Sequence, residues 1–132
     1  MSAEKRRILL VEDDVDLMEQ TRDFLSGEGY EMLCAGTEKE GTALIEKENF
    51  DAAVLDLMLE NPDSGFVMAY QIKKKSAAIP VLLVTSVTRD TGYAFGSAGG
   101  KDGWIKADVI IQKDMRFEQL KSELERLLGA VK

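Results

Sequence analysis

Residues 51–56 read DAAVLD, an apolar run that is closed by a carboxylate at Asp56. Short apolar runs of this kind are typical of parallel strands that are buried on both faces of a sheet. Four similar apolar runs occur elsewhere in the chain, and most of the segments between the runs have apolar residues at the spacing of a helix. This alternation predicts an α/β domain whose parallel sheet is covered by helices on both faces. The other expected strands are residues 8–11, 32–35, 81–84 and 109–112.

Four segments carry apolar side chains at the three- and four-residue spacing of a helix that packs one face against a sheet. Gly27 and Gly29 are expected to end the first helix and Gly129 the last, because glycine is common just after a helix C-terminus. The predicted helices span residues 15–26, 38–48, 65–75 and 115–128.

One segment does not fit this pattern. Residues 88–106 should hold a helix before the fifth strand, yet five of the eleven glycines fall between Gly92 and Gly103. Each glycine destabilises a helix interior by about 1 kcal/mol relative to alanine. We therefore expect an irregular glycine-rich segment in place of a regular fourth helix. The predicted fold is a doubly wound, five-stranded, flavodoxin-like parallel sheet that forms one domain over residues 1–132, with no output domain.

The composition narrows the possible functions. The chain has 132 residues and a formal net charge of −7, which argues against a nucleic-acid surface because phosphate binding depends on clustered Lys and Arg. We find no apolar run as long as a membrane span and no signal-peptide pattern, so we predict a protein that does not bind membranes. We expect the single Cys34 to be a buried thiol, which favours a reducing, cytoplasmic location. Histidine is absent, which removes the commonest general base and metal ligand.

Polar side chains follow the ends of four expected strands. Glu12 and Asp13 follow the first strand, Asp56 closes the third, Thr85 follows the fourth and Lys113 follows the fifth. Because ligands of open α/β sheets bind at the carboxyl ends of the strands, we expect these side chains to converge on one pocket. Three carboxylates at such a place suit Mg²⁺, which takes a few acidic ligands together with water and phosphate oxygens.

These residues also have simpler interpretations. The dipole of a helix favours acids in its first turn, and we assign that role to Asp14 and Asp16. Asp13 alone fits either role, and the threonine and lysine at the other strand ends would each be ordinary by themselves. Asp56 favours the metal site, because a carboxylate at the end of an apolar strand needs a reason to be buried there.

Taken in order, these motifs resemble the receiver domain of bacterial two-component response regulators. The matching stretches are ILLVEDD at residues 8–14, LDLML at 55–59, DSGF at 63–66, PVLLVTS at 80–86, and Lys113. Each motif alone is weak evidence, but all of them in this order and at this spacing are strong evidence. The resemblance covers essentially the whole chain. The resemblance implies a stand-alone, phosphorylation-controlled signalling module. It would not be a metabolic enzyme, since it would catalyse only its own phosphorylation and dephosphorylation.

The resemblance implies a role for each site residue. By position, Asp56 would accept a phosphoryl group from a sensor histidine kinase or a phosphotransfer protein. Glu12, Asp13 and Asp56 would hold Mg²⁺ together with the backbone carbonyl of Met58. A carboxylate is a competent phosphoryl acceptor, and a cation stabilises the charge on the transferred group.

Two further residues would contact the phosphoryl group. The Thr85 hydroxyl would bond its oxygens, and Lys113 would pair with its charge. The modified domain would then dock on an unidentified protein target or relay the group, as a monomer or a weak dimer.

The chain departs from the family pattern near Lys113. Asp114 follows it where receivers usually have proline, which disfavours a cis peptide bond because non-proline cis bonds cost about 2.5–4 kcal/mol. Ile110 stands where many receivers carry Tyr or Phe, and the glycine-rich segment, which includes Trp104, lengthens the chain before Lys113. These departures keep open a degenerate receiver that acts as a phosphorylation-independent scaffold.

Two other classes of protein match parts of the sequence. An aspartyl-phosphate phosphohydrolase of the haloacid-dehalogenase type also uses a strand-end aspartate and Mg²⁺. It usually needs a second aspartate two residues later, where Met58 stands and cannot transfer a proton. A flavodoxin-like cofactor binder would need a phosphate-cradling loop after the first strand, where residues 12–14 (EDD) would repel that phosphate.

Overall fold

The computed structural model describes residues 6–56, 59, 64–85, 108–112 and 117–130. The predicted glycine-rich segment at residues 88–106 lies outside these ranges. The strands are β1 (Arg7–Val11), β2 (Glu31–Ala35), β3 (Ala52–Asp56), β4 (Val81–Thr85) and β5 (Val109–Gln112). The helices are α1 (Val15–Gly27), α2 (Glu38–Lys47), α3 (Ser64–Lys75) and α5 (Phe117–Ala130).

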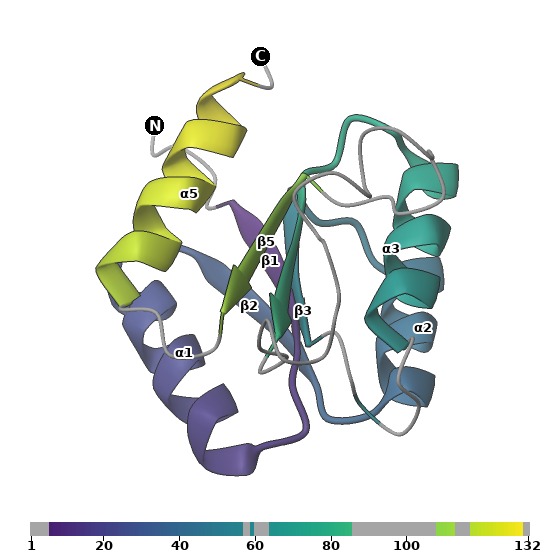
Figure 1. The fold of residues 1–132 in the computed structure, drawn as a ribbon, viewed down its shortest axis with the longest axis horizontal. Coiled ribbons are helices and arrows are strands. Elements are labelled where there is room, and N and C mark those ends of the chain that lie inside the picture. Colours follow the sequence, from purple (N-terminus) through teal and green to yellow (C-terminus); the bar gives the residue numbers. More distant parts are fainter. Residues whose placement is uncertain (1–5, 57–58, 60–63, 86–107, 113–116, 131–132) are drawn as a thin grey trace.

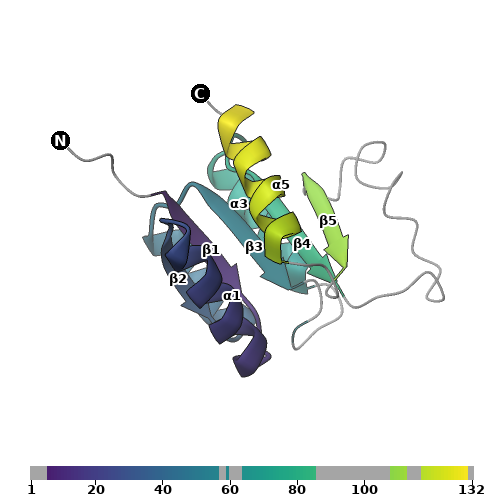
Figure 2. The ribbon, with the colours of Figure 1, turned by 90° about the vertical axis from the view of Figure 1, so that its left-hand side faces the viewer.

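The five strands form one parallel sheet in the order β2-β1-β3-β4-β5. Helices α1 and α5 cover one face and α2 and α3 cover the other (Figures 1 and 2). This arrangement confirms the predicted doubly wound α/β fold. All strands point the same way, so the C-terminal ends of β1, β3, β4 and β5 lie along one edge of the sheet, which we call the carboxyl edge.

The core consists of two apolar layers, one on each face of the sheet. Successive side chains of a strand point to opposite faces, so Leu9 and Val11 of β1 face α2 and α3 while Ile8 and Leu10 face α1 and α5. Every residue of β3 and β4 is buried. Burial on both faces explains why these strands appear in the sequence as continuous apolar runs.

Helix α2 packs very closely against the sheet at Gly41. A Cβ atom at this position would lie 2.7 Å from Met68 Sδ and 3.1 Å from a Val11 methyl carbon. Both distances are shorter than an ordinary van der Waals contact of about 3.5–4.0 Å. Glycine is therefore required for the present spacing between α2, α3 and the end of β1, which immediately precedes Glu12.

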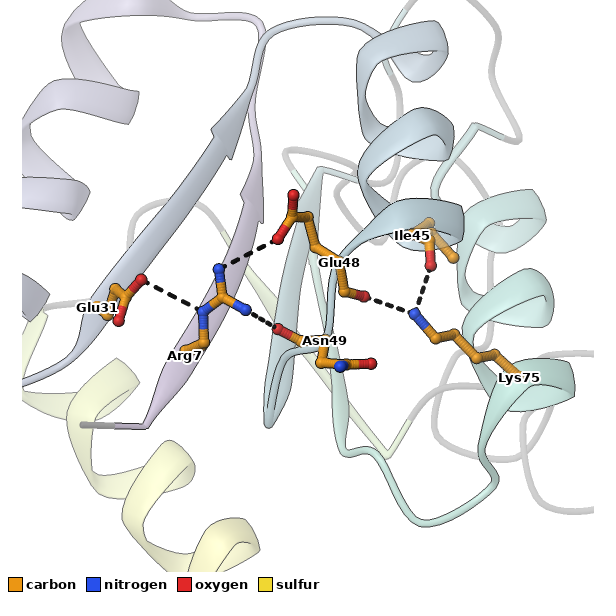
Figure 3. A network of polar contacts seen from close by, with 6 residues as sticks. All are labelled: Arg7, Glu31, Ile45, Glu48, Asn49 and Lys75. Atoms are coloured by element: carbon orange, nitrogen blue, oxygen red, sulfur yellow. Dashed lines mark hydrogen bonds and ion pairs between the residues drawn. The ribbon is translucent and has the colours of Figure 1, made fainter. Parts of the chain in front are cut away.

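Two cations join the elements at the opposite edge of the sheet (Figure 3). Arg7 donates a hydrogen bond to the Asn49 carbonyl at 2.7 Å and forms ion pairs with Glu31 and Glu48 at 3.3 and 3.2 Å. Lys75 donates to the carbonyls of Ile45 and Glu48 at 2.7 and 2.5 Å, which satisfies acceptors at the C-terminus of α2. These contacts tie the starts of β1 and β2 to the C-terminus of α2, and α2 to α3, far from the carboxyl edge.

Three local predictions need correction. Helix α1 includes Gly27 and ends before Glu28, while Gly29 has the positive φ of 99° that only glycine adopts readily. Gly129 does not close α5, which continues to Ala130. Glycine costs a helix only about 1 kcal/mol, and the neighbouring Leu128 is buried in the core. Cys34 is half-buried rather than buried, because β2 is an edge strand.

Candidate functional site

Three carboxylates come together at the carboxyl edge. Val11 of β1 is aligned with Leu55 of β3, so the residues that follow them, Glu12 and Asp56, lie side by side. The carboxylates of Glu12, Asp13 and Asp56 each offer an oxygen, and these oxygens lie within 4.8 Å of one another. Glu12 and Asp56 are 5% and 3% exposed, while Asp13 is exposed to solvent. The structure thus brings together the three predicted acidic metal ligands.

Backbone contacts fix the chain on both sides of Glu12. Its amide donates to the Ala35 carbonyl at 3.0 Å, which extends the pairing of β1 with β2 beyond the strand end. Its carboxylate accepts a hydrogen bond from the Asp14 amide at 3.1 Å. Asp14 in turn caps α1 by accepting from the Leu17 amide at 3.1 Å, as predicted. The turn between β1 and α1 therefore holds Glu12 and Asp13 at the start of a helix.

Thr85 lies on the same edge, one strand further along. It is the last residue of β4 and is 1% exposed. Asp56 is aligned with Val84, so Thr85 lies one residue beyond the aligned partner of Asp56. Gln112 is aligned with Thr85 on β5 and immediately precedes Lys113. Lys113 itself and Met58, the other two predicted site residues, lie outside the residues that the structure describes.

One polar pair near the site, between the buried Ser64 and the half-buried Glu38, was not anticipated from the sequence. The Ser64 hydroxyl donates a hydrogen bond of 2.7 Å to Glu38 Oε1. Ser64 is the first residue of α3, and Glu38 is the first residue of α2. Ser64 is completely buried. The pair ties together the starts of two helices that both follow the carboxyl edge. No sequence motif indicates it, because the two residues are 26 positions apart and meet only through helix packing.

The oxygen donors fit Mg²⁺. This ion holds its ligands at about 2.0–2.1 Å, so two oxygens on opposite sides of it lie about 4.2 Å apart. The present limit of 4.8 Å exceeds that span by only about 0.6 Å, which small side-chain rotations would close. Three like charges at this distance repel one another, and a divalent cation removes that repulsion. Waters and phosphate oxygens would complete the coordination.

Comparison with known proteins decides the family. The family model of the response regulator receiver domain matches residues 8–125. The chain belongs to this family. It is 31% identical, over 98% of its length, to the transcriptional regulatory protein RprY of Bacteroides fragilis. It spans 52% of that relative and 44% of the regulatory protein PmrA of Pectobacterium parmentieri, so it corresponds to about half of each.

Solved receiver domains have the same fold. A CheY-like receiver domain from Methanospirillum hungatei is 26% identical and matches with a TM-score of 0.82, covering 96% of both chains. The response regulator TrrA of Thermotoga maritima, solved with Mg²⁺ and BeF, is 25% identical with a TM-score of 0.75, covering 92% of this chain and 98% of that one. The receiver fold predicted from the sequence is therefore confirmed.

The family places this chain in two-component signalling, as predicted. Response regulators of this family work with sensor kinases.

Among the helices in the described part of the chain, none has both the length and the apolar character that crossing a bilayer requires.

Proposed function

We propose that this receiver is a phosphorylation switch in which Asp56 accepts a phosphoryl group with Mg²⁺ bound beside it. The observation that carries the proposal is the cluster of Glu12, Asp13 and Asp56 at the carboxyl edge, with oxygens within 4.8 Å of one another. Such a cluster is unfavourable for folding by itself, since it collects like charges. Its position at the ends of parallel strands is where α/β sheets bind their ligands.

The proposed step is a phosphoryl transfer. A carboxylate oxygen of Asp56 forms a bond to phosphorus while the bond from phosphorus to the donor's histidine nitrogen breaks, and that nitrogen keeps the electron pair. Mg²⁺, when bound, neutralises charge on the transferred oxygens. Glu12 and Asp13 would hold the cation, and the contacts of the β1–α1 turn keep the Glu12 carboxylate in place.

Thr85 and Lys113 would respond to the new charge. Thr85 ends β4 beside Asp56, so its hydroxyl is well placed to donate to a phosphoryl oxygen. Lys113 follows the strand next to β4, and we assign it the pairing role from its sequence position, together with a carbonyl ligand role for Met58. The expected donor is a sensor histidine kinase or a phosphotransfer protein, and the expected output is docking on a partner protein or relay of the group. Metabolic turnover is not expected.

Intact mass spectrometry tests the acceptor. After incubation with Mg²⁺ and acetyl phosphate, the wild type should gain the mass of one phosphoryl group, and EDTA should prevent the gain. The Asp56→Ala variant should gain nothing. Labelling that persists in this variant would show that the acceptor is another residue. A wild type that stays unmodified under all conditions, with its own kinase as well, would favour the phosphorylation-independent scaffold.

Calorimetric titration tests the metal ligands. The Asp13→Ala variant should bind Mg²⁺ at least about tenfold more weakly, which corresponds to about 1.4 kcal/mol. Asp16→Ala is the matched control, because Asp16 is an exposed acid in the first turn of α1 and outside the cluster. Equal losses in the two variants would mean that general electrostatic attraction, and not coordination, explains the affinity.

A further inference from the structure

A cavity lies beside the metal cluster, between α1 and α5 and over the sheet. Its volume is about 210 Å³. The two helices cover the same face of the sheet (Figure 2). Apolar side chains from three strands and both helices form most of its wall: Leu10, Leu17, Val54, Val84, Phe117 and Leu120.

The cavity is a pocket that is partly open to solvent, where the exposed Gln20 lies at its rim, and not an enclosed void. An engineered apolar cavity of about 150 Å³ binds benzene. The cavity of about 210 Å³ therefore has room for one six-membered ring with one or two small substituents.

Three polar side chains share the wall with these apolar groups. They are Glu12, Gln20 and Thr21, of which Glu12 and Thr21 are 5% and 6% exposed. A hydrocarbon would give these polar side chains no hydrogen bond, whereas a ring with a polar substituent can give one. A hydroxyl group on the ring could donate to a carboxylate and accept from an amide. An anionic substituent would be repelled by Glu12, Asp13 and Asp56, whose oxygens cluster within 4.8 Å.

We propose that this cavity binds a small monocyclic phenol and that its occupancy weakens Mg²⁺ binding through Glu12. Glu12 lines the cavity and belongs to the metal cluster, so a hydroxyl that donates to its carboxylate reduces the negative charge available to the cation. Coupling of two sites is reciprocal, hence Mg²⁺ weakens phenol binding by the same factor. The coupling rests on the metal site proposed above, whereas the cavity does not involve phosphorylation of Asp56.

Isothermal titration with p-cresol in the absence of Mg²⁺ tests the cavity independently of the proposed switch. The wild type should bind one molecule with a dissociation constant in the millimolar range or tighter, and benzoate should not bind. Gln20→Trp should weaken p-cresol binding at least about tenfold, because the indole fills the rim of the cavity. Glu19→Trp is the matched control, since Glu19 is an adjacent exposed residue of α1 that does not line the cavity, and it should bind like the wild type.

A second variant distinguishes a polar site from an apolar void. Thr21→Val keeps the shape of the side chain and removes its hydroxyl, so it should weaken the binding of p-cresol relative to that of toluene. Lack of saturation with p-cresol, equal binding by the two tryptophan variants, or equal binding of benzoate would overturn the site.

The coupling has its own readout. Saturating p-cresol should raise the Mg²⁺ dissociation constant at least about twofold, and Mg²⁺ should raise that of p-cresol by the same factor. If p-cresol leaves the Mg²⁺ affinity unchanged, the link through Glu12 is overturned. If an Asp56→Ala variant still binds p-cresol, the cavity works without the phosphoryl acceptor.

Discussion

Replacing Gly41 by alanine should destabilise the protein through a clash that the structure defines. The new Cβ would lie 2.7 Å from Met68 Sδ and 3.1 Å from a Val11 methyl carbon, so α2 or its neighbours must move by about 0.5–1 Å to reach normal contact. Overpacking of this kind typically costs about 1–3 kcal/mol. Alanine returns about 1 kcal/mol through its helix propensity. The expected net loss is therefore up to about 2 kcal/mol.

Gly129→Ala is the matched control. Gly129 is also inside a helix, but a Cβ there would meet no atom within 4 Å. This variant should keep the wild-type stability or gain up to about 1 kcal/mol. The difference between the two variants removes much of the propensity term, although Gly129 is the penultimate residue of its helix, and measures mainly the clash, at about 1–3 kcal/mol.

Urea unfolding followed by circular dichroism provides the measurement, with the slope of the transition checked for constancy. Gly41→Ala placed in a Met68→Ala background should lose less stability than in the wild type, because the sulfur that it meets is gone. Equal stabilities of the Gly41→Ala and Gly129→Ala variants would refute the close-packing argument. The clash also involves Val11, which immediately precedes the proposed metal ligand Glu12. Mg²⁺ affinity should therefore fall in Gly41→Ala and stay unchanged in Gly129→Ala.

Three further results are expected. Lys75→Met should lower the free energy of unfolding by about 1 kcal/mol, because it removes two hydrogen bonds to α2 carbonyls, while Lys74→Met should change it little. Burial raises the pKa of the Cys34 thiol, so iodoacetamide at pH 8 should label the folded protein more slowly than the unfolded one. Burial, together with the nearby charge of Glu125, raises the pKa of the Tyr30 hydroxyl. The stability that Tyr30 contributes is complete below about pH 10, the ordinary pKa, and is lost as the pH rises through the pKa of the folded state. Tyr30→Phe should therefore lose less stability than the wild type when unfolding is measured at high pH.

The layers of the fold could be predicted because they depend on local patterns. Buried strands need apolar side chains on both faces, and β3 and β4 have them without interruption. The ends of helices depend on smaller energies. Gly129 was predicted to end α5, yet the cost of one glycine is smaller than the benefit of packing the apolar stripe of that helix to its end.

The site could be predicted only as far as strand ends determine it. Parallel strands place Glu12 beside Asp56 once their register is known, and the apolar runs come close to fixing that register. The pair of Ser64 and Glu38 could not be found in this way, because its distance depends on how α2 packs against α3. The roles of Lys113 and Met58 still rest on sequence position alone.

Acidic residues have different neighbours at the two edges of the sheet. At the edge where the strands begin, acids lie against cations: Arg7 pairs with Glu31 and Glu48, and Lys73 pairs with Asp108 at 2.8 Å. At the carboxyl edge, three carboxylates are held within 4.8 Å of one another. Folding stability alone explains the first arrangement and opposes the second, since like charges at that distance repel. Natural proteins accept such local costs mainly at functional sites, where a bound ligand can offset the repulsion. The repulsion within this cluster is therefore a physical argument for the proposed role of Asp56, and it predicts that a cation binds there before any phosphoryl group arrives.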